Sequence, residues 1–175
     1  MQRCRTGSFE HKGRRLVYDD YGRGDRVLVY LHGLLLDAEL NRGIAEAMAD
    51  RGNRVVLLDL LGHGRSDSPA HASEYRIDSY AEQVVALLDH LDVERAALGG
   101  LSLGANVSLV AAVEHPERVR GLILEMPVME WAVPAAALAF VPMLLAAHYG
   151  RPLLALTSSV MRRVPRTPVS SLNSL

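Results

Sequence analysis

The chain has 175 residues, of which 49% are hydrophobic and 22% charged, and its formal net charge is −1. This apolar fraction excludes a mainly disordered chain, and the length fits one globular domain rather than two. The balance of 19 basic against 20 acidic residues disfavours a nucleic-acid partner held by bulk electrostatics. Cys4 is the only cysteine, which excludes a disulfide within the chain. No apolar run follows Arg3 and Arg5, so we expect a cytoplasmic protein without an export signal.

Hydrophobic periodicity in the first third of the chain indicates strands and one helix. Residues 2–21 are predicted to form two short strands around the turn His11-Lys12-Gly13. Two continuous apolar runs, at 26–31 and 54–58, are typical of strands buried on both faces of a parallel sheet. Between these runs, residues 38–50 have apolar side chains at helical spacing, so we expect a helix there.

The middle of the chain continues this alternation. A helix is predicted over residues 79–91, with Ser79 and Glu82 as a capping box at its start. Strands alternating with helices of about a dozen residues indicate βαβ units, so the predicted fold class is α/β with a mostly parallel sheet. The further elements are a strand over 95–100, a helix over 103–114 that ends before His115-Pro116, and a strand over 120–124.

The segment Gly100-Leu101-Ser102-Leu103-Gly104 matches the pattern G-x-S-x-G and joins a predicted buried strand directly to a helix. A serine in this context lies on a tight turn at the carboxyl edge of the sheet, where its hydroxyl can attack a substrate. We expect Gly100 and Gly104 to be required because the turn crowds its neighbours against the backbone. The following helix directs its amino terminus at the site, which favours developing negative charge. Ser102 is therefore the candidate nucleophile, and the alternative is a serine that only caps the helix.

The loop after the 26–31 strand is the second candidate part of the site. It begins with His32 and Gly33, and in a nucleophile-elbow arrangement such a loop supplies one backbone N–H of the oxyanion hole. The residue after the nucleophile supplies the other N–H, so the expected donors are the amides of Leu34 and Leu103. We interpret His32 as a structural residue that braces the loop, with direct catalysis as the alternative.

A polar turn from Asp59 to Asp67 follows the 54–58 strand. Its glycines allow a sharp turn, and its polar side chains can form hydrogen bonds with neighbouring backbone. We therefore expect this turn to be scaffolding. The alternative places His63 in the active site.

Taken together, these motifs resemble the α/β-hydrolase family, and the resemblance extends over nearly the whole chain up to residue 126. It implies an eight-stranded, mostly parallel sheet with a Ser-acid-His triad, no cofactor, and in many members a helical cap after the sixth strand. On this basis we expect a hydrolase core over 1–126, a helical cap or lid over 127–163, and a disordered tail over 164–175. The motifs that carry the resemblance are HG at 32–33, GHGRSD at 62–67, GLSLG at 100–104 and HPERV at 115–119.

The triad that the resemblance implies is incomplete in this sequence. In the family the acid and the histidine follow the nucleophile, usually after the seventh and eighth strands. The chain reaches the cap segment after six predicted strands, so we expect a C-terminally truncated form that lacks the last two strands. Glu125 is the candidate acid because some members place it after the sixth strand; Glu130 is the alternative, and both are equally interpretable as loop carboxylates. The base is unassigned, and the histidines that could approach the serine are His148 and, with strain, His32 and His63.

The leading hypothesis is a serine hydrolase that acts on a carboxylic ester or related acyl substrate, but is incomplete as this chain because a serine without a base is a weak nucleophile. The alternative is a non-catalytic pseudo-hydrolase or fragment that binds an apolar ligand or a partner. The sequence does not separate esterase from thioesterase, C–C hydrolase, haloperoxidase-like or acyltransferase activity. An apolar substrate group is indicated by side chains of the cap segment, which are more often used for packing: Trp131, Val133, Leu138, Phe140, Met143 and Leu144.

Metal and nucleotide cofactors are not expected, because the sequence has no H-x-x-x-H motif, no cysteine pair, and no glycine-rich phosphate loop after the first parallel strand. Residues 131–150 are uncharged, but Pro134 and Pro142 interrupt them, so spanning a membrane is disfavoured and surface docking is a minor alternative. The sixth predicted strand would form an exposed apolar edge of the sheet. Such edges aggregate or find a partner, so self-association through this edge is a further expectation.

Overall fold

The structure is a computed structural model that describes residues 4–129 together with residues 134, 138, 141 and 145. The chain divides into two compact units, Met1–Val128 and Met129–Leu175. The predicted cap over 127–163 and tail over 164–175 lie almost wholly outside the described residues, so both stay predictions.

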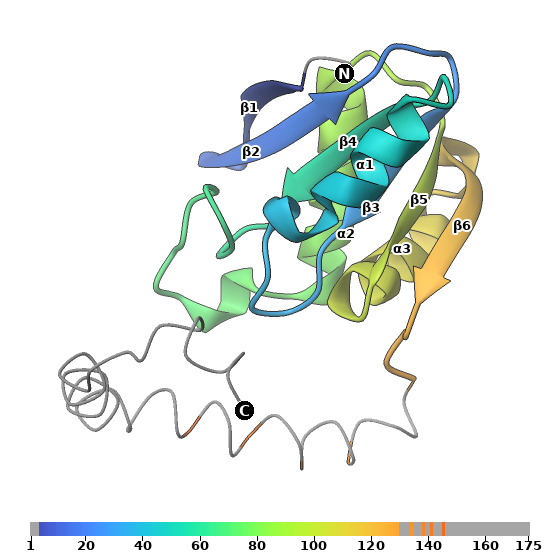
Figure 1. The fold of residues 1–175 in the computed structure, drawn as a ribbon. Coiled ribbons are helices and arrows are strands. Elements are labelled where there is room, and N and C mark those ends of the chain that lie inside the picture. Colours follow the sequence, from blue (N-terminus) through green and yellow to red (C-terminus); the bar gives the residue numbers. More distant parts are fainter. Residues whose placement is uncertain (1–3, 130–133, 135–137, 139–140, 142–144, 146–175) are drawn as a thin grey trace, which may run out of the picture. The chain divides into compact units, whose positions relative to one another are not determined.

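Six strands form one sheet in the order β1-β2-β4-β3-β5-β6 (Figure 1). The first two strands and β4 pair antiparallel, whereas β4, β3, β5 and β6 pair parallel. The predicted α/β class with a mostly parallel sheet is thereby confirmed. The strands are β1 (Arg5–His11), β2 (Arg14–Tyr21), β3 (Val27–Leu31), β4 (Arg54–Asp59), β5 (Ala96–Leu101) and β6 (Val119–Glu125).

Helices cover both faces of this sheet. Figure 1 shows α1 (Arg42–Ala49) in front of the sheet and the helices α2 (Ile77–His90) and α3 (Leu103–Glu114) behind it. A short 3-10 turn, Ala38–Asn41, leads directly into α1, so the helix expected over 38–50 is present in two parts. Helices on both faces explain why the central strands read as continuous apolar runs rather than as alternating ones.

The central strands build two hydrophobic cores, one on each side of the sheet. Every residue of β3 is buried, and successive side chains point to opposite faces. Val29 and Leu31 join the larger core with α2 and α3, whereas Leu28 and Tyr30 join the smaller core with α1. This double burial holds the carboxyl ends of β3 and β5 rigidly side by side, which is where the candidate site lies.

The predicted start of the second long helix is wrong. Helix α2 begins at Ile77, with Arg76 at the N-cap, so Ser79 lies inside the first turn and forms no capping box with Glu82. The Asp78 carboxylate instead accepts a hydrogen bond from the Ser79 N–H (2.9 Å), and Glu82 pairs with Lys12 of the hairpin at 2.5 Å. The S-x-x-E spacing therefore occurs by coincidence inside a helix that begins earlier, at Ile77.

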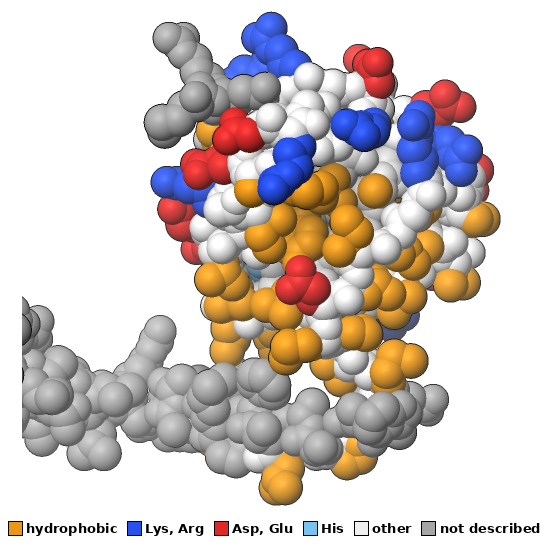
Figure 2. All heavy atoms as spheres, turned by 45° about the vertical axis from the view of Figure 1, so that its right-hand side comes forward, with side chains coloured by type: hydrophobic (Ala, Val, Ile, Leu, Met, Phe, Trp, Pro, Cys, Tyr) orange, Lys and Arg blue, Asp and Glu red, His pale blue; other side chains and the backbone are white. Residues whose placement is uncertain are grey.

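Strand β6 forms one edge of the sheet among the described residues. Its side chains are far more exposed than those of β3: Leu122 is 39% exposed and Ile123 41%. Figure 2 shows hydrophobic side chains gathered on the face of the molecule that this edge occupies. Self-association through this edge stays a prediction.

Candidate active site

Ser102 lies at the turn between β5 and α3, in a backbone conformation that few L-residues adopt. Its φ is +52° and its ψ is −108°, outside the regions that are comfortable for a residue with a Cβ atom. Although Ser102 occupies the N-cap position of α3, its side chain makes no capping hydrogen bond. The backbone is fixed instead, because its N–H donates to the Glu125 carbonyl (2.8 Å) and its carbonyl accepts from the Asn106 N–H (3.1 Å). The hydroxyl is therefore held at a defined place but is not used by the helix.

The two motif glycines permit this turn by close backbone approach. A Cβ atom on Gly100 would lie 2.6 Å from the Leu31 carbonyl oxygen, and one on Gly104 would lie 2.4 Å from the same atom. Both distances are below 3.0 Å, closer than Cβ atoms in proteins approach atoms to which they are not bonded. The first turn of α3 thus packs directly on the end of β3, which brings the elbow next to the loop that follows β3.

That loop contains the first expected oxyanion donor. Leu31 pairs with Gly100 in the parallel register, so the loop leaves β3 beside the elbow. A Cβ atom on Gly33 would lie 3.5 Å from the Leu101 carbonyl oxygen, which shows how closely the loop packs on β5. No described residue accepts a hydrogen bond from the N–H of Leu34 or of Leu103. Leu103 is the first residue of α3, where helix geometry leaves the N–H free.

His32 is fully buried, and both of its ring nitrogens are used inside the fold. Its Nε2 accepts a hydrogen bond from the Leu60 N–H (3.1 Å), so the proton resides on Nδ1, which donates to the Gly33 carbonyl (2.8 Å). Burial lowers the pKa of the imidazole and keeps it neutral. This arrangement ties the loop after β3 to the turn after β4, and it leaves no nitrogen of His32 free for proton transfer.

The turn from Asp59 to Asp67 is organised around a buried carboxylate. Asp59 accepts hydrogen bonds from the N–H groups of Ala38 (2.8 Å) and Arg65 (3.2 Å) and from the Arg65 guanidinium (2.8 Å). Arg65 also donates two hydrogen bonds, of 3.1 and 2.9 Å, to the carboxylate of Asp19 in β2. These bonds raise the pKa of the Arg65 guanidinium. Ser66 donates to the Asp59 carbonyl and accepts from the N–H of Val17. The polar groups of this turn thus form hydrogen bonds that connect the end of β4 to β2.

His63 also belongs to this turn, and its Nδ1 lies 3.1 Å from the Leu61 carbonyl. Its ring centre is 4.9 Å from that of His32. No hydrogen bond joins His63, or any other histidine of the described part of the chain, to the Ser102 hydroxyl. Of the histidines considered as the base, His148 lies outside the described residues.

These features decide the family. A family model described as the alpha/beta hydrolase fold matches residues 26–169. The chain belongs to the alpha/beta hydrolase fold family. Its Ser102 lies at the strand-to-helix junction, between the close-packed glycines that the tight turn of a nucleophile elbow requires.

Relatives of this hydrolase-fold chain act on different substrates. The 2-hydroxymuconate semialdehyde hydrolase of Pseudomonas sp. (strain CF600) is 43% identical over 74 residues, which are 42% of this chain and 26% of that protein. The 2-hydroxy-6-oxononadienedioate/2-hydroxy-6-oxononatrienedioate hydrolase of Burkholderia vietnamiensis is 38% identical over 114 residues, 63% of this chain and 39% of that protein. The solved structure of epoxide hydrolase A from Mycobacterium thermoresistibile superposes with a TM-score of 0.67 at 32% identity, covering 70% of this chain and 39% of that one. The chain therefore spans about two fifths or less of the length of these proteins.

Two side chains near the elbow were not predicted from sequence. The Tyr30 hydroxyl donates a hydrogen bond to the Glu125 carboxylate, and burial together with this bond raises the pKa of the phenol. The Tyr30 ring reaches β6 across Gly99, where a Cβ atom would lie 3.1 Å from the ring. Asn106 of α3 forms two hydrogen bonds with the backbone of Val128, of 2.8 and 2.9 Å. The sequence does contain one signal for the Tyr30 contact. The G-x-S-x-G motif requires Gly100 but not Gly99, and the additional glycine makes room for the Tyr30 ring.

Other classes of site are not seen in residues 4–129. That region contains no group of three or more His, Cys, Asp or Glu side chains placed to hold a metal ion. No helix there is both long enough and apolar enough to cross a membrane. The apolar cap side chains expected to favour an apolar substrate lie outside the described residues, except Leu138, which is exposed. Glu130, the alternative acid, also lies outside them.

Proposed function

We propose that this chain carries the nucleophilic half of a serine hydrolase, with Ser102 attacking a carboxylic ester or related acyl group. The observation that carries the proposal is the backbone of Ser102, held at a φ of +52° with its hydroxyl unused by helix α3. A residue needed only as a cap would not require this conformation, which costs on the order of 1–3 kcal/mol. Strain of this kind persists where the surrounding structure and the chemistry both require it.

The proposed reaction follows from the groups around the serine. The Ser102 oxygen forms a bond to the acyl carbon while its proton passes to a general base. The carbonyl oxygen becomes an oxyanion, which the N–H groups of Leu34 and Leu103 stabilise. Collapse of this intermediate breaks the C–O bond to the leaving alcohol, which takes up the proton held by the base. Water then attacks the acyl-enzyme, which releases the carboxylic acid and restores the Ser102 hydroxyl. No histidine of the described residues is bonded to the Ser102 hydroxyl, so we propose that the general base comes from a residue outside them.

A serine nucleophile favours acyl substrates over alkyl ones. If Ser102 attacked an epoxide carbon, the intermediate would be an ether, which water does not cleave under mild conditions. Attack on a carbonyl carbon gives an ester intermediate, which water can hydrolyse to regenerate the serine. The names of the first two relatives describe semialdehyde and oxo substrates, so carbonyl-containing substrates are also consistent with those similarities. Among the activities within the family, we therefore propose ester or acyl-bond hydrolysis rather than epoxide opening.

Glu125 is the proposed acid of the site. It lies at the carboxyl end of β6, and its backbone carbonyl is bound to the Ser102 N–H, so it is fixed next to the elbow. Its carboxylate accepts a hydrogen bond from the Tyr30 hydroxyl, which holds the side chain in place beside the elbow. In this role Glu125 would orient the histidine that acts as base.

Hydrolysis of p-nitrophenyl esters of increasing acyl length tests the proposal. Without a base in the described residues, we expect only slow turnover through an acyl-enzyme at Ser102, seen as p-nitrophenol release together with an acyl adduct in the intact mass of the chain. Ser102→Ala should abolish this activity, whereas Ser8→Ala, which changes an exposed serine of β1, should leave it intact. Equal activity of wild type and Ser102→Ala would refute the role of Ser102. Saturable binding of the esters without turnover would support the pseudo-hydrolase alternative.

A further inference from the structure

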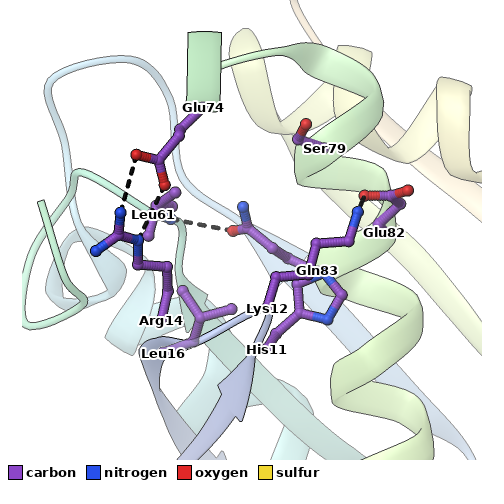
Figure 3. A pocket seen from close by; sticks show the side chains of 9 residues that line it. All are labelled: His11, Lys12, Arg14, Leu16, Leu61, Glu74, Ser79, Glu82 and Gln83. Carbon is purple, nitrogen blue, oxygen red and sulfur yellow. Dashed lines mark hydrogen bonds and ion pairs between the residues drawn. The ribbon is translucent and has the colours of Figure 1, made fainter. Parts of the chain in front are cut away.

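A small cavity with polar side chains around an apolar lining lies between the β1–β2 hairpin, the turn after β4 and helix α2 (Figure 3). Its volume is about 90 Å³, equivalent to about three water molecules at the ~30 Å³ that each occupies in the liquid. No residue of the candidate active site lines it. The side chains that do are those of His11, Lys12, Arg14, Leu16, Leu61, Glu74, Ser79, Glu82 and Gln83.

Gln83 is the group that points to a ligand. Its side chain is only 3% exposed, and its Oε1 accepts a hydrogen bond from the Leu61 N–H (3.1 Å). Since an N–H donor must meet the amide oxygen, this bond fixes the orientation of the amide. The Nε2 group is then directed into the open space between Glu74 and Ser79 (Figure 3). No described residue accepts a hydrogen bond from it, and the group keeps enough contact with solvent to be free for a ligand or water.

His11 also lines this cavity, and one of its ring nitrogens is unsatisfied within the part of the chain that the structure describes. Its Nε2 is buried and has no hydrogen-bond partner among the described residues. Burial, together with the nearby Lys12 charge, lowers the pKa of this imidazole and favours its neutral form. Two polar nitrogens from separate elements thus border one cavity without a partner from the fold.

The charges around the cavity cancel. Arg14 holds Glu74 with two hydrogen bonds of 2.9 and 3.0 Å, and Lys12 pairs with Glu82 at 2.5 Å. An anionic ligand would be attracted by Lys12 and Arg14 but repelled by Glu74 and Glu82. A cationic ligand would be attracted by the two carboxylates and repelled by the two cations. An uncharged ligand with both donors and acceptors can use every polar group without disturbing either ion pair.

We propose that this cavity binds a small, uncharged ligand that carries a carboxamide or hydroxyl groups. Its oxygen accepts a hydrogen bond from Gln83 Nε2, and its N–H or O–H groups donate to the carboxylates of Glu74 or Glu82. The apolar side chains of Leu16 and Leu61 contact its carbon atoms. This site is separate from Ser102 and does not depend on the proposed hydrolase activity.

Acetamide and acetate are matched probes, since they have nearly the same shape and differ in charge. We expect acetamide, titrated into the ¹⁵N-labelled 175-residue chain, to shift the Gln83 side-chain amide and the Leu61 backbone amide saturably, with a dissociation constant in the millimolar range that suits so few atoms. Acetate should bind at least tenfold more weakly. Acetate binding as well as acetamide, or neither probe causing saturable shifts, would overturn the proposal and leave a cavity that holds only water.

Two variants test the assigned groups. Gln83→Glu keeps an oxygen for the Leu61 N–H but removes the inward donor, so acetamide binding should weaken at least tenfold. Val113→Glu adds the same charge at an exposed position of α3 and should bind acetamide as wild type does. Glu82→Gln changes only an exposed ion pair and leaves the lining with one excess positive charge, so the preference should shift toward acetate. Unchanged acetamide binding in Gln83→Glu, or an unchanged preference in Glu82→Gln, would contradict the assignment.

Discussion

Two glycine-containing turns follow strands of the same sheet, and they use their polar groups in opposite ways. In the Asp59–Asp67 turn after β4, the Asp59 carboxylate and the Ser66 hydroxyl are buried and bonded to neighbouring backbone. In the Gly100–Gly104 turn after β5, the Ser102 hydroxyl makes no capping bond, and the Leu103 N–H has no acceptor among the described residues. The polar groups of the first turn are bonded within the fold, whereas those of the second turn are free to bind a ligand.

This contrast separates scaffold from chemistry without reference to any relative. A buried polar group left without a partner costs about 1–3 kcal/mol, so folds normally satisfy such groups. Where a turn is held rigidly but keeps donors and a hydroxyl free, those groups can act on a substrate whose charge develops during reaction. Mutations in the scaffold turn should therefore reduce stability, and mutation of Ser102 should reduce activity alone.

The largest expected effect is at the centre of the scaffold turn. Asp59→Ala removes a fully buried carboxylate with three hydrogen bonds, and we expect a loss of about 3 kcal/mol in the free energy of unfolding, the low end for a buried pair because Arg65 is partly exposed. Asp89→Ala breaks the exposed pair with Arg118 and should cost no more than about 1 kcal/mol. Urea denaturation of both variants checks the difference, and equal losses would contradict a scaffold role for Asp59.

Close packing of the elbow predicts the next effect. Gly104→Ala places a Cβ atom 2.4 Å from the Leu31 carbonyl oxygen, so we expect a loss of about 2 kcal/mol from overpacking. Gly43→Ala in α1 meets no atom within 4 Å and should stabilise the protein by about 0.5–1 kcal/mol. In urea denaturation, Gly104→Ala should lower the midpoint relative to wild type and Gly43→Ala should raise it. An unchanged midpoint in Gly104→Ala would show that the α3–β3 contact is not tight.

The two serines offer the most direct comparison of the turns. Ser66→Ala loses two buried hydrogen bonds and should cost about 1.5 kcal/mol. Ser102→Ala loses no capping bond and should change stability by less than about 0.5 kcal/mol. Thermal or urea unfolding of the pair tests this, and a larger loss in Ser102→Ala would assign Ser102 to the fold.

The smallest effect concerns pH. Burial lowers the pKa of His32 in the folded protein, whereas the unfolded chain protonates near the ordinary value of about 6.5. Below that pH the unfolded state binds the extra proton, so stability falls as pH drops, by at most about 1.4 kcal/mol per pH unit from this group. Urea midpoints at pH 7.5 and 5.5 should therefore differ more in wild type than in His32→Gln. An equal difference in both proteins would place the pH dependence elsewhere.

Much of this architecture follows from local patterns. Strands β3 and β4 are buried on both faces of the sheet, which requires continuous apolar sequences, and these sequences identified them. The position of Ser102 between a strand and a helix identified the elbow. The start of α2 could not be predicted, because a serine and a glutamate three residues apart fit a cap and a helix interior equally well. The Tyr30–Glu125 and Asn106–Val128 bonds join residues 95 and 22 positions apart, so they depend on a strand order that periodicity does not reveal.

Labelling by a fluorophosphonate, with the modified residue located by peptide mass spectrometry, tests the central claim most directly. We expect prolonged exposure of the folded 175-residue chain to modify Ser102 selectively among its serines, and Ser102→Ala, equally stable, to take up no reagent at this turn. Selectivity is expected because helix α3 makes no capping bond with this hydroxyl and the N–H of the next residue, Leu103, has no acceptor among the described residues. Modification of Ser66 or other serines as readily as Ser102, or no adduct at Ser102, would contradict the assignment of this turn to chemistry.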